Sequence, residues 1–407
     1  MSGALPSDTL VGMSPALSDG YDLLVPARVV FGWGRRSELG RRLGAIGRRA
    51  FVVRGARSLE RAGVFDHLRE IVEAAGVEWV DIDQVHREPL VEDVDCLAAR
   101  LRERGPGDGD VVVGIGGGAA LDLAKAGCAM ATNRESATVR DYLEGVGSGL
   151  ALREAPLPFV AVPTTAGTGS EATRNAVISQ PEPPFKKSLR SDLVVARVAL
   201  IDPELTVAVP AETTANTGMD AITQLIESYI STRARPVPRA LALDGLRGAL
   251  AAVHRAVADP TDRRAREVMA HAAFLSGVAL ANSGLGMAHG VAAALGIHCA
   301  VPHGLACAVM LPAALRANRA VRRRDLAELA AVALERRFES EDVAASALID
   351  EIDRLCDDIG IPRRLGVLGV TRERIPALVA SSRGNSMSGN PRELSDEELG
   401  EVLEAML

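Results

Sequence analysis

The sequence is poor in aromatic residues and has few cysteines. Aromatic residues make up 3% of the 407 residues, so the core must be packed mainly with Ala, Val, Leu and Ile. The 5 cysteines are scattered, odd in number and never arranged as CxxC. This pattern argues against a disulfide framework and against a thiolate metal site.

Long apolar runs and an excess of positive charge are also missing. No stretch of about 18 apolar residues is free of charge, so no membrane-spanning helix is expected. Residues 1–20 lack the basic start and apolar run of a secretory signal. The net charge of -7 disfavours nucleic acid or an anionic membrane as a partner. The sequence therefore predicts a cytoplasmic protein with neither of these partners.

The pattern of apolar residues divides the chain into three parts. Residues 1–22, rich in Ser, Gly and Pro, predict a flexible lead-in. In residues 23–205, short apolar runs alternate with helical patterns, which favours a parallel sheet covered by helices. In residues 206–407 the helical period dominates, and convincing strand runs are absent. An α/β domain followed by an all-helical domain is therefore expected. The predicted strands are 50–53, 77–82, 111–113 and 159–162, and the clearest predicted helices are 58–75, 91–104, 250–258, 267–281 and 346–359.

A glycine-rich turn follows one of the predicted strands. Gly116, Gly117 and Gly118 stand between the apolar run 111–113 and a helical pattern. Glycines at such a turn let the backbone approach a pyrophosphate, whose charge a helix N-terminus favours. The spacing is not GxGxxG, so an ordinary Rossmann fingerprint is absent. A tight strand–helix turn without a ligand fits this segment equally well.

A second loop, residues 163–171, follows the predicted strand 159–162. It places hydroxyls and glycines where a strand ends at the carboxyl edge of the sheet, the usual ligand position in open α/β sheets. The alternative is a capped helix start, with Thr168 or Ser170 as the N-cap residue. The density of hydroxyl groups favours a binding role.

The helical half contains residue types that bind metals. Asp220 and Gln224 lie four apart, so they share one face of a predicted helix. His289 and His303 lie fourteen apart. A carboxylate with two imidazoles suits zinc or iron. Spacing alone does not establish the site, because a histidine taken singly is more often a core or surface residue than a ligand.

Eight ordered segments resemble the iron-containing (group III) alcohol dehydrogenase family, over roughly residues 25–400. They are FGWGRRSELG (31–40), GGGAALDLAK (116–125), PTTAGTGSEAT (163–173), DPELT (202–206), TGMDAITQLIESY (217–229), ANSGLGMAHG (281–290), PHG (302–304) and GNPR (389–392).

The resemblance implies a nucleotide-binding α/β domain, a helical domain and a cleft between them, the fold shared by iron alcohol dehydrogenases and dehydroquinate synthase. It implies NAD(H) or NADP(H), one ferrous or zinc ion, and hydride transfer between alcohols and aldehydes or ketones. By position it assigns four metal ligands, Asp220, Gln224, His289 and His303. It assigns the cofactor contacts to Gly55, Gly116, Gly117, Gly118, Ala119, Asp122, Thr164, Thr165, Thr168, Asn175 and Lys186.

Three positions depart from the family pattern. Ala119 replaces a serine, although backbone amides can still bind phosphate. Gln224 replaces a histidine, and because an amide oxygen is the weaker ligand, the metal is expected to be weakly held. Ala293 replaces a second histidine of the cleft, and a positioned acid–base group contributes about 10²–10⁴-fold. His298 or water is expected to supply the proton instead, with Lys186 as a further catalytic residue beside the cofactor.

These observations predict an NAD(P)-dependent, metal-assisted reductase or dehydrogenase of a small aldehyde or its alcohol. NADP(H) is favoured because Arg54 and Arg57 flank Gly55, where an acidic residue would repel the 2′-phosphate. Two alternatives remain: a dehydroquinate synthase-like lyase or cyclase that uses NAD and metal, and a catalytically degenerate cofactor-binding protein. The substrate, the direction and the assembly stay open, with a homodimer as one candidate.

Overall fold

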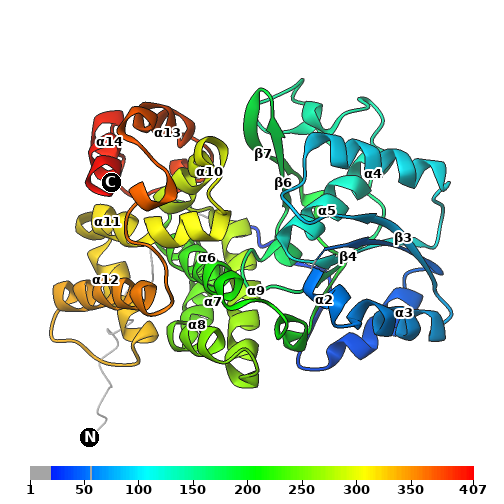
Figure 1. Ribbon diagram of the computed structural model, residues 1–407, viewed down its shortest axis with the longest axis horizontal. Helices are drawn as coiled ribbons and strands as arrows, with labels where there is room; N and C mark the ends of the chain where they lie inside the picture. Colours follow the sequence, from blue (N-terminus) through cyan, green and yellow to red (C-terminus); the bar gives the residue numbers. More distant parts are fainter. Residues whose placement is uncertain (1–19, 56) are drawn as a thin grey trace, which may run out of the picture.

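The computed structural model describes residues 20–55 and 57–407. A sheet-based half and a helical half lie side by side (Figure 1). Most of the predicted lead-in, residues 1–19, lies outside the described residues.

The first half is built on one parallel sheet. Its strand order is β1-β8-β5-β4-β2-β3, and every pairing in it is parallel. The strands are β1 (Val29–Phe31), β2 (Arg49–Arg54), β3 (Glu78–Gln84), β4 (Asp110–Gly116), β5 (Phe159–Pro163) and β8 (Val198–Ile201). The central strands β4 and β5 are buried along their whole length, as expected where helices cover both faces of a parallel sheet.

Alternating side chains of these strands point to two separate cores. Val112 faces α4 (Val91–Glu103) and α5 (Gly118–Thr132). Val111 and Val113 face α1 (Leu39–Gly44) and α3 (Val64–Ala74) on the other side. The period of two along the strand therefore fills both helical layers.

All four predicted strands form, but four others were not predicted. The edge strand β1 and the short strand β8 extend the sheet, while β6 (Asn175–Pro181) and β7 (Pro184–Arg190) form an antiparallel hairpin. The hairpin escaped prediction because it lies outside the main sheet and carries many polar residues. The predicted helix 58–75 is in fact two helices, α2 (Arg57–Arg61) and α3, because Gly63 between them is left-handed at φ 67°.

The second half is helical, and no strand occurs in the described residues beyond β8. Its helices are α6 (Ala211–Ile230), α7 (Pro236–Leu246), α8 (Ala249–Ala258), α9 (Arg263–Ser283), α10 (Met287–Cys299), α11 (His303–Ala333), α12 (Glu341–Asp358), α13 (Ile375–Ser381) and α14 (Asp396–Ala405). Helix α6 packs against both α9 and α11, so its side chains reach the middle of this half. The predicted fold class is confirmed.

None of the helices in the described residues is by itself long and apolar enough to cross a membrane. Helices α9 and α10, which are bent by 100° at their junction, reach the required length and hydropathy only when the two are taken together.

The loop between β5 and β6 connects the two halves. Gly169 packs against Gly277 of α9 so closely that a Cβ atom on Gly169 would lie 2.4 Å from the Cα of Gly277. Gly167 packs in the same way against Thr217 of α6, where a Cβ atom would lie 2.5 Å from the threonine Cβ. Such contacts require glycine, and they fix this loop against the helical half.

Candidate functional site

The predicted cofactor residues meet at one edge of the sheet. Gly55 and Thr164 follow β2 and β5, and Gly116 is the last residue of β4, which lies between these two strands in the parallel sheet. A Cβ atom on Gly116 would lie 3.0 Å from the Cα of Gly55, so the backbones approach closely here. Helix α5 begins at Gly118, and Ala119 lies in its first turn. The helix N-terminus and the glycines together form a surface suited to a phosphate.

Two predicted cofactor contacts have buried polar atoms without a hydrogen-bond partner. These atoms are Oγ1 of Thr164 and Oδ1 of Asn175. Thr165 and Thr168 lie over the glycine turn, where a Cβ atom on Gly118 would be 2.9 Å from Oγ1 of Thr168. Buried polar atoms are nearly always paired, so these unpaired ones fit a bound polar molecule.

Asp122, another predicted cofactor contact, has hydrogen-bond partners within the protein. Its carboxylate accepts hydrogen bonds from the Ser170 hydroxyl at 2.5 Å and from the backbone N–H of Val177 at 3.0 Å. Lys125 lies beside it, fully buried, and donates to the backbone oxygens of Ser170 and Asn175 at 2.7 and 2.8 Å. Burial raises the pKa of Asp122. These bonds join Asp122 to the loop after β5 and to β6, and its contact with a cofactor stays a prediction.

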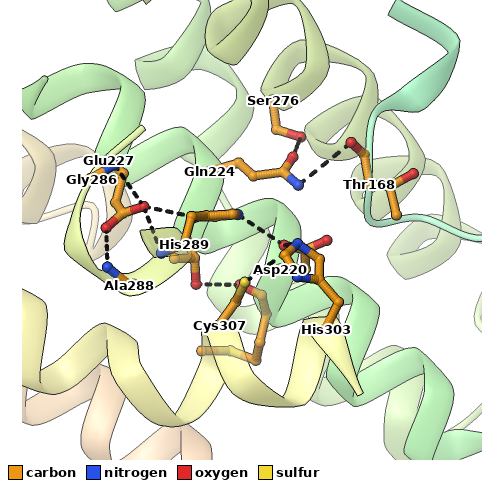
Figure 2. A network of polar contacts seen from close by, with 12 residues as sticks. Thr168, Asp220, Gln224, Glu227, Ser276, Gly286, Ala288, His289, His303 and Cys307 are labelled. Atoms are coloured by element: carbon orange, nitrogen blue, oxygen red, sulfur yellow. Dashed lines mark hydrogen bonds and ion pairs between the residues drawn. The ribbon is translucent and has the colours of Figure 1, made fainter. Parts of the chain in front are cut away.

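Three predicted metal ligands gather where α6, α10 and α11 meet (Figure 2). Asp220, His289, His303 and also Cys307 offer ligand atoms that all lie within 4.8 Å of one another. Oδ1 of Asp220 lies 3.2 Å from Nε2 of His289 and 3.9 Å from Nε2 of His303. Two nitrogen or oxygen ligands of a tetrahedral zinc ion stand about 3.3 Å apart, given bonds of about 2.0–2.1 Å. This donor set therefore fits a divalent metal.

Glu227, which the sequence argument missed, fixes the orientation of His289. Its Oε2 lies 2.7 Å from Nδ1 of His289, and its carboxylate also accepts the backbone N–H groups of Gly286 and Ala288 at 3.1 and 2.6 Å. The Nδ1 hydrogen thus points at Glu227 and Nε2 points at Asp220. Glu227 stands seven residues after Asp220 on the same face of α6, and this spacing is a signal that could have revealed it.

Gln224 does not direct its side chain at the cluster. Its Oε1 accepts from the Ser276 hydroxyl at 2.6 Å, and its Nε2 lies 3.5 Å from the backbone oxygen of Thr168 (Figure 2). Its role as a metal ligand therefore stays a prediction. Cys307 lies in the cluster instead, contrary to the expectation that no thiolate takes part. The spacing of four between His303 and Cys307 on one helix could have indicated it.

The charges around the cluster set the protonation of the two histidines. Burial, helped by the positive charge of Lys186, lowers the pKa of His303 to about 4. Burial alone would also lower the pKa of His289, but Cys307, Asp220 and Glu227 raise it well above its usual value. Burial would raise the pKa of Asp220, yet its contact with His289 and the charge of His303 hold it down. An ionised carboxylate and a neutral His303 imidazole are the forms that bind metals.

Of the two predicted catalytic residues, Lys186 is the one near the cluster, since its positive charge acts on His303. It belongs to β7, forms an ion pair with Glu88, and its Nζ lies 4.0 Å from where a Cβ atom on Gly296 of α10 would be. His298 comes nine residues after His289 on α10, which is about 13 Å along the axis and half a turn round it. Its Nε2 lies 2.7 Å from the Ser381 hydroxyl. The structure therefore does not bring His298 to the metal ligands.

Comparisons with known proteins agree with this geometry. Residues 26–203 match the model of the iron-containing alcohol dehydrogenases, and residues 214–407 match that of the C-terminal region of this family. The chain is 36% identical to the 1,3-propanediol dehydrogenase of Klebsiella pneumoniae, covering 94% of this chain and 97% of the relative.

Two solved structures are similar to this one over almost the whole chain. A crystal structure of 1,3-propanediol oxidoreductase gives a TM-score of 0.88 at 34% identity and covers 95% of this chain and 100% of that one. The crystal structure of the sulfoacetaldehyde reductase of Bifidobacterium kashiwanohense in complex with NAD+ gives a TM-score of 0.84 at 29% identity. That match covers 95% of this chain and 98% of the other.

A sheet edge suited to a phosphate, together with a buried cluster of side chains that could hold a metal, is what a nicotinamide- and metal-dependent oxidoreductase requires. The chain belongs to the iron-containing alcohol dehydrogenase family. It is accordingly an enzyme that interconverts alcohols and aldehydes with NAD(H) and a divalent metal. The sequence predicted this reaction and the metal, and it favoured NADP(H) over NAD(H).

Proposed function

We propose that the enzyme works as a reductase of a small aldehyde, with a site formed by Asp220, His289 and His303 on one side and the glycine turn on the other. The observation that carries this proposal is the convergence of these three side chains within 4.8 Å. When bound, the divalent metal polarises the substrate oxygen and the nicotinamide supplies hydride. The protein's own side chains position the substrate and the cofactor for this reaction.

The burial of the ligands indicates the side from which the substrate enters. The side chains of Asp220 and His289 are 2% and 4% exposed, whereas that of His303 is 30% exposed. The substrate oxygen therefore approaches past His303. Lys186 lies on this side, and its ammonium group can orient the oxygen or a cofactor amide. Water supplies the proton, because His298 lies away from the cluster.

The substrate class follows from the relatives. Two of these relatives, the 1,3-propanediol dehydrogenase and the sulfoacetaldehyde reductase, are named after small, oxygen-rich substrates. We therefore propose an aldehyde of a few carbon atoms that carries a second polar group, for which Lys186 supplies a charge.

Location, assembly and domain division are also proposals. Use of a nicotinamide cofactor favours the cytoplasm, and a homodimer is the assembly to be tested by light scattering. A division into residues 23–205 and 206–407 is supported by β8 ending at Ile201 and α6 beginning at Ala211.

A chelator experiment tests the proposed function. The protein is dialysed against a chelator, its metal content is measured by elemental analysis, and oxidation of NADPH and NADH is followed by absorbance with a panel of small aldehydes. We expect activity to disappear and to return with zinc or ferrous iron. Full activity in metal-free protein would contradict the metal site. Cofactor binding without net nicotinamide turnover would favour the lyase or the degenerate protein.

A further inference from the structure

We infer that Cys307 is the fourth protein ligand of the metal, binding as a thiolate where Gln224 was expected, and that the site therefore selects zinc over ferrous iron. This inference deepens the proposed metal site and rests on it. The two candidates for the fourth ligand, Cys307 and Gln224, differ in the partners that their side chains contact.

The geometry of Cys307 matches a metal ligand. Its Sγ lies 3.7 Å from Nε2 of His303. A tetrahedral zinc ion with bonds of about 2.3 Å to sulfur and about 2.0–2.1 Å to nitrogen separates such a pair by about 3.6 Å. Cys307 follows His303 by one turn of α11, so both side chains lie on one helix face. Its side chain is fully buried, and its sulfur lies within 4.8 Å of all three other ligand atoms.

The contacts of Gln224 point to a different role. Its amide oxygen is held by Ser276 at 2.6 Å, and its amide nitrogen lies 3.5 Å from the backbone oxygen of Thr168. Gln224 thus connects α6 with α9 and with the cofactor-side loop. Figure 2 shows the amide directed toward these two partners, while Cys307 and His303 lie together on the other side of Asp220.

Thiolate ligation widens the preference for zinc over ferrous iron that the order of divalent-metal affinities already gives. As the metal binds, the sulfur–hydrogen bond of Cys307 breaks, its electron pair forms the sulfur–metal bond, and the proton leaves to solvent. Thiolate is a soft ligand, and a tetrahedral set that mixes sulfur and nitrogen is typical of zinc. Oxygen and nitrogen ligands alone would leave ferrous iron a stronger competitor.

X-ray absorption at the zinc edge tests the ligand directly in the wild-type chain. The protein is stripped with a chelator, reloaded with one equivalent of zinc and measured without substrate. We expect one sulfur neighbour at about 2.3 Å beside nitrogen and oxygen neighbours at about 2.0–2.1 Å. A shell of nitrogen and oxygen alone would overturn the inference. A sulfur-to-metal charge-transfer band in the cobalt-loaded protein gives the same information.

Variants then assign the sulfur. Loss of a partner outside the ligand shell typically lowers metal affinity about 10–100-fold, so Cys307→Ala should weaken zinc binding by about 100-fold or more. Cys356→Ser, a buried cysteine of α12, is the matched control and should bind zinc as the wild type does. If Cys307→Ala keeps its zinc affinity and Gln224→Ala loses it, Gln224 is the ligand.

Metal choice is measured separately, by offering equimolar zinc and ferrous iron under anaerobic conditions. Zinc should fill the wild-type site, and preferential retention of iron would overturn the predicted selectivity. These measurements require no turnover. Inactivity toward aldehydes with sulfur in the zinc shell would defeat only the proposed function. If Cys307→Ala fails to fold, the wild-type spectrum still decides the ligand.

Discussion

Nδ1 of His289 lies 2.7 Å from Oε2 of Glu227, and both side chains are almost fully buried. A carboxylate in this position accepts the Nδ1 hydrogen and turns Nε2 toward Asp220, so a metal that displaces the Nε2 proton would bind the lone pair there. The same carboxylate accepts the backbone N–H groups at the start of α10. Glu227 therefore sets both the orientation of the His289 ring and the position of its helix.

The first prediction concerns this positioning role. Glu227→Gln keeps the size of the side chain but removes its charge, so we expect metal affinity to fall about 10–100-fold. The measurement is a zinc titration in competition with a chromophoric chelator. Glu70→Gln, on the exposed face of α3, serves as the control and should change nothing. Equal affinities in all three proteins would show that Glu227 only supports the fold.

The second prediction concerns Lys186, compared with its neighbour Lys187. Lys186 lies beside α10, whereas Nζ of Lys187 lies near Gly145 on the other face of the hairpin. Lys186→Met should lower kcat/KM for the aldehyde by about tenfold or more, a modest share of the range for a positioned polar group. The kcat/KM of Lys187→Met for the aldehyde should lie within about twofold of the wild-type value. Equal losses in the two variants would remove Lys186 from the site.

The third prediction corrects an expectation from the sequence. His298 fills a gap in the family pattern only by its chain position, since its imidazole bonds to Ser381. We expect His298→Ala to change turnover by less than about twofold, far below the general acid–base range. A tenfold loss together with an altered pH–rate profile would return His298 to the mechanism.

Sequence reasoning succeeded where a local pattern determines the structure. Gly116 ends a strand whose apolar run cannot be exposed, so the glycine turn and the sheet edge followed directly. It failed where a role depends on contacts between helices. Gln224 contacts Ser276 of α9, a residue far along the chain, so spacing could not reveal this contact. Cys307 and His303 lie one turn apart on α11, a spacing that the sequence argument overlooked.

The fourth prediction concerns pH and stability. Glu171, in the loop that joins the two halves, is 3% exposed, and burial raises its pKa from 4.5 to about 7. Between these two pH values the unfolded chain loses the proton and the native chain keeps it, so stability falls as pH rises. Glu171→Gln should remove this fall in stability, because glutamine does not titrate.

Urea unfolding at about pH 5 and about pH 8 measures the effect. The free energy of unfolding of Glu171→Gln, relative to the wild type, should rise between the two conditions by about 3 kcal/mol at most. Glu154→Gln, at an exposed position, is the control. The same pH dependence in the wild type and Glu171→Gln would show that Glu171 is ionised in the native state.

The last prediction concerns the choice between NADPH and NADH, for which Arg54 and Arg57 were expected to act together. In the structure Nε of Arg54 lies 3.1 Å from Asp81, and its guanidinium covers the ring of Phe65 at 5.3 Å. Arg57 is exposed at the start of α2 and stands two residues after Gly55 in the sequence. Because Arg54 already has an anionic partner, Arg57 is the guanidinium better placed to bind a 2′-phosphate.

We therefore expect the ratio of kcat/KM for NADPH over NADH to exceed one in the wild type. Arg57→Ala should lower this ratio by about tenfold, the low end for a hydrogen bond to a charged group of about 1.5–3 kcal/mol. Arg54→Ala should lower it less, because the arginine must first leave Asp81 to reach a phosphate. A wild-type ratio below one would rule out the preference for NADP(H). A larger effect from Arg54→Ala would instead show that its ion pair with Asp81 opens when the cofactor binds.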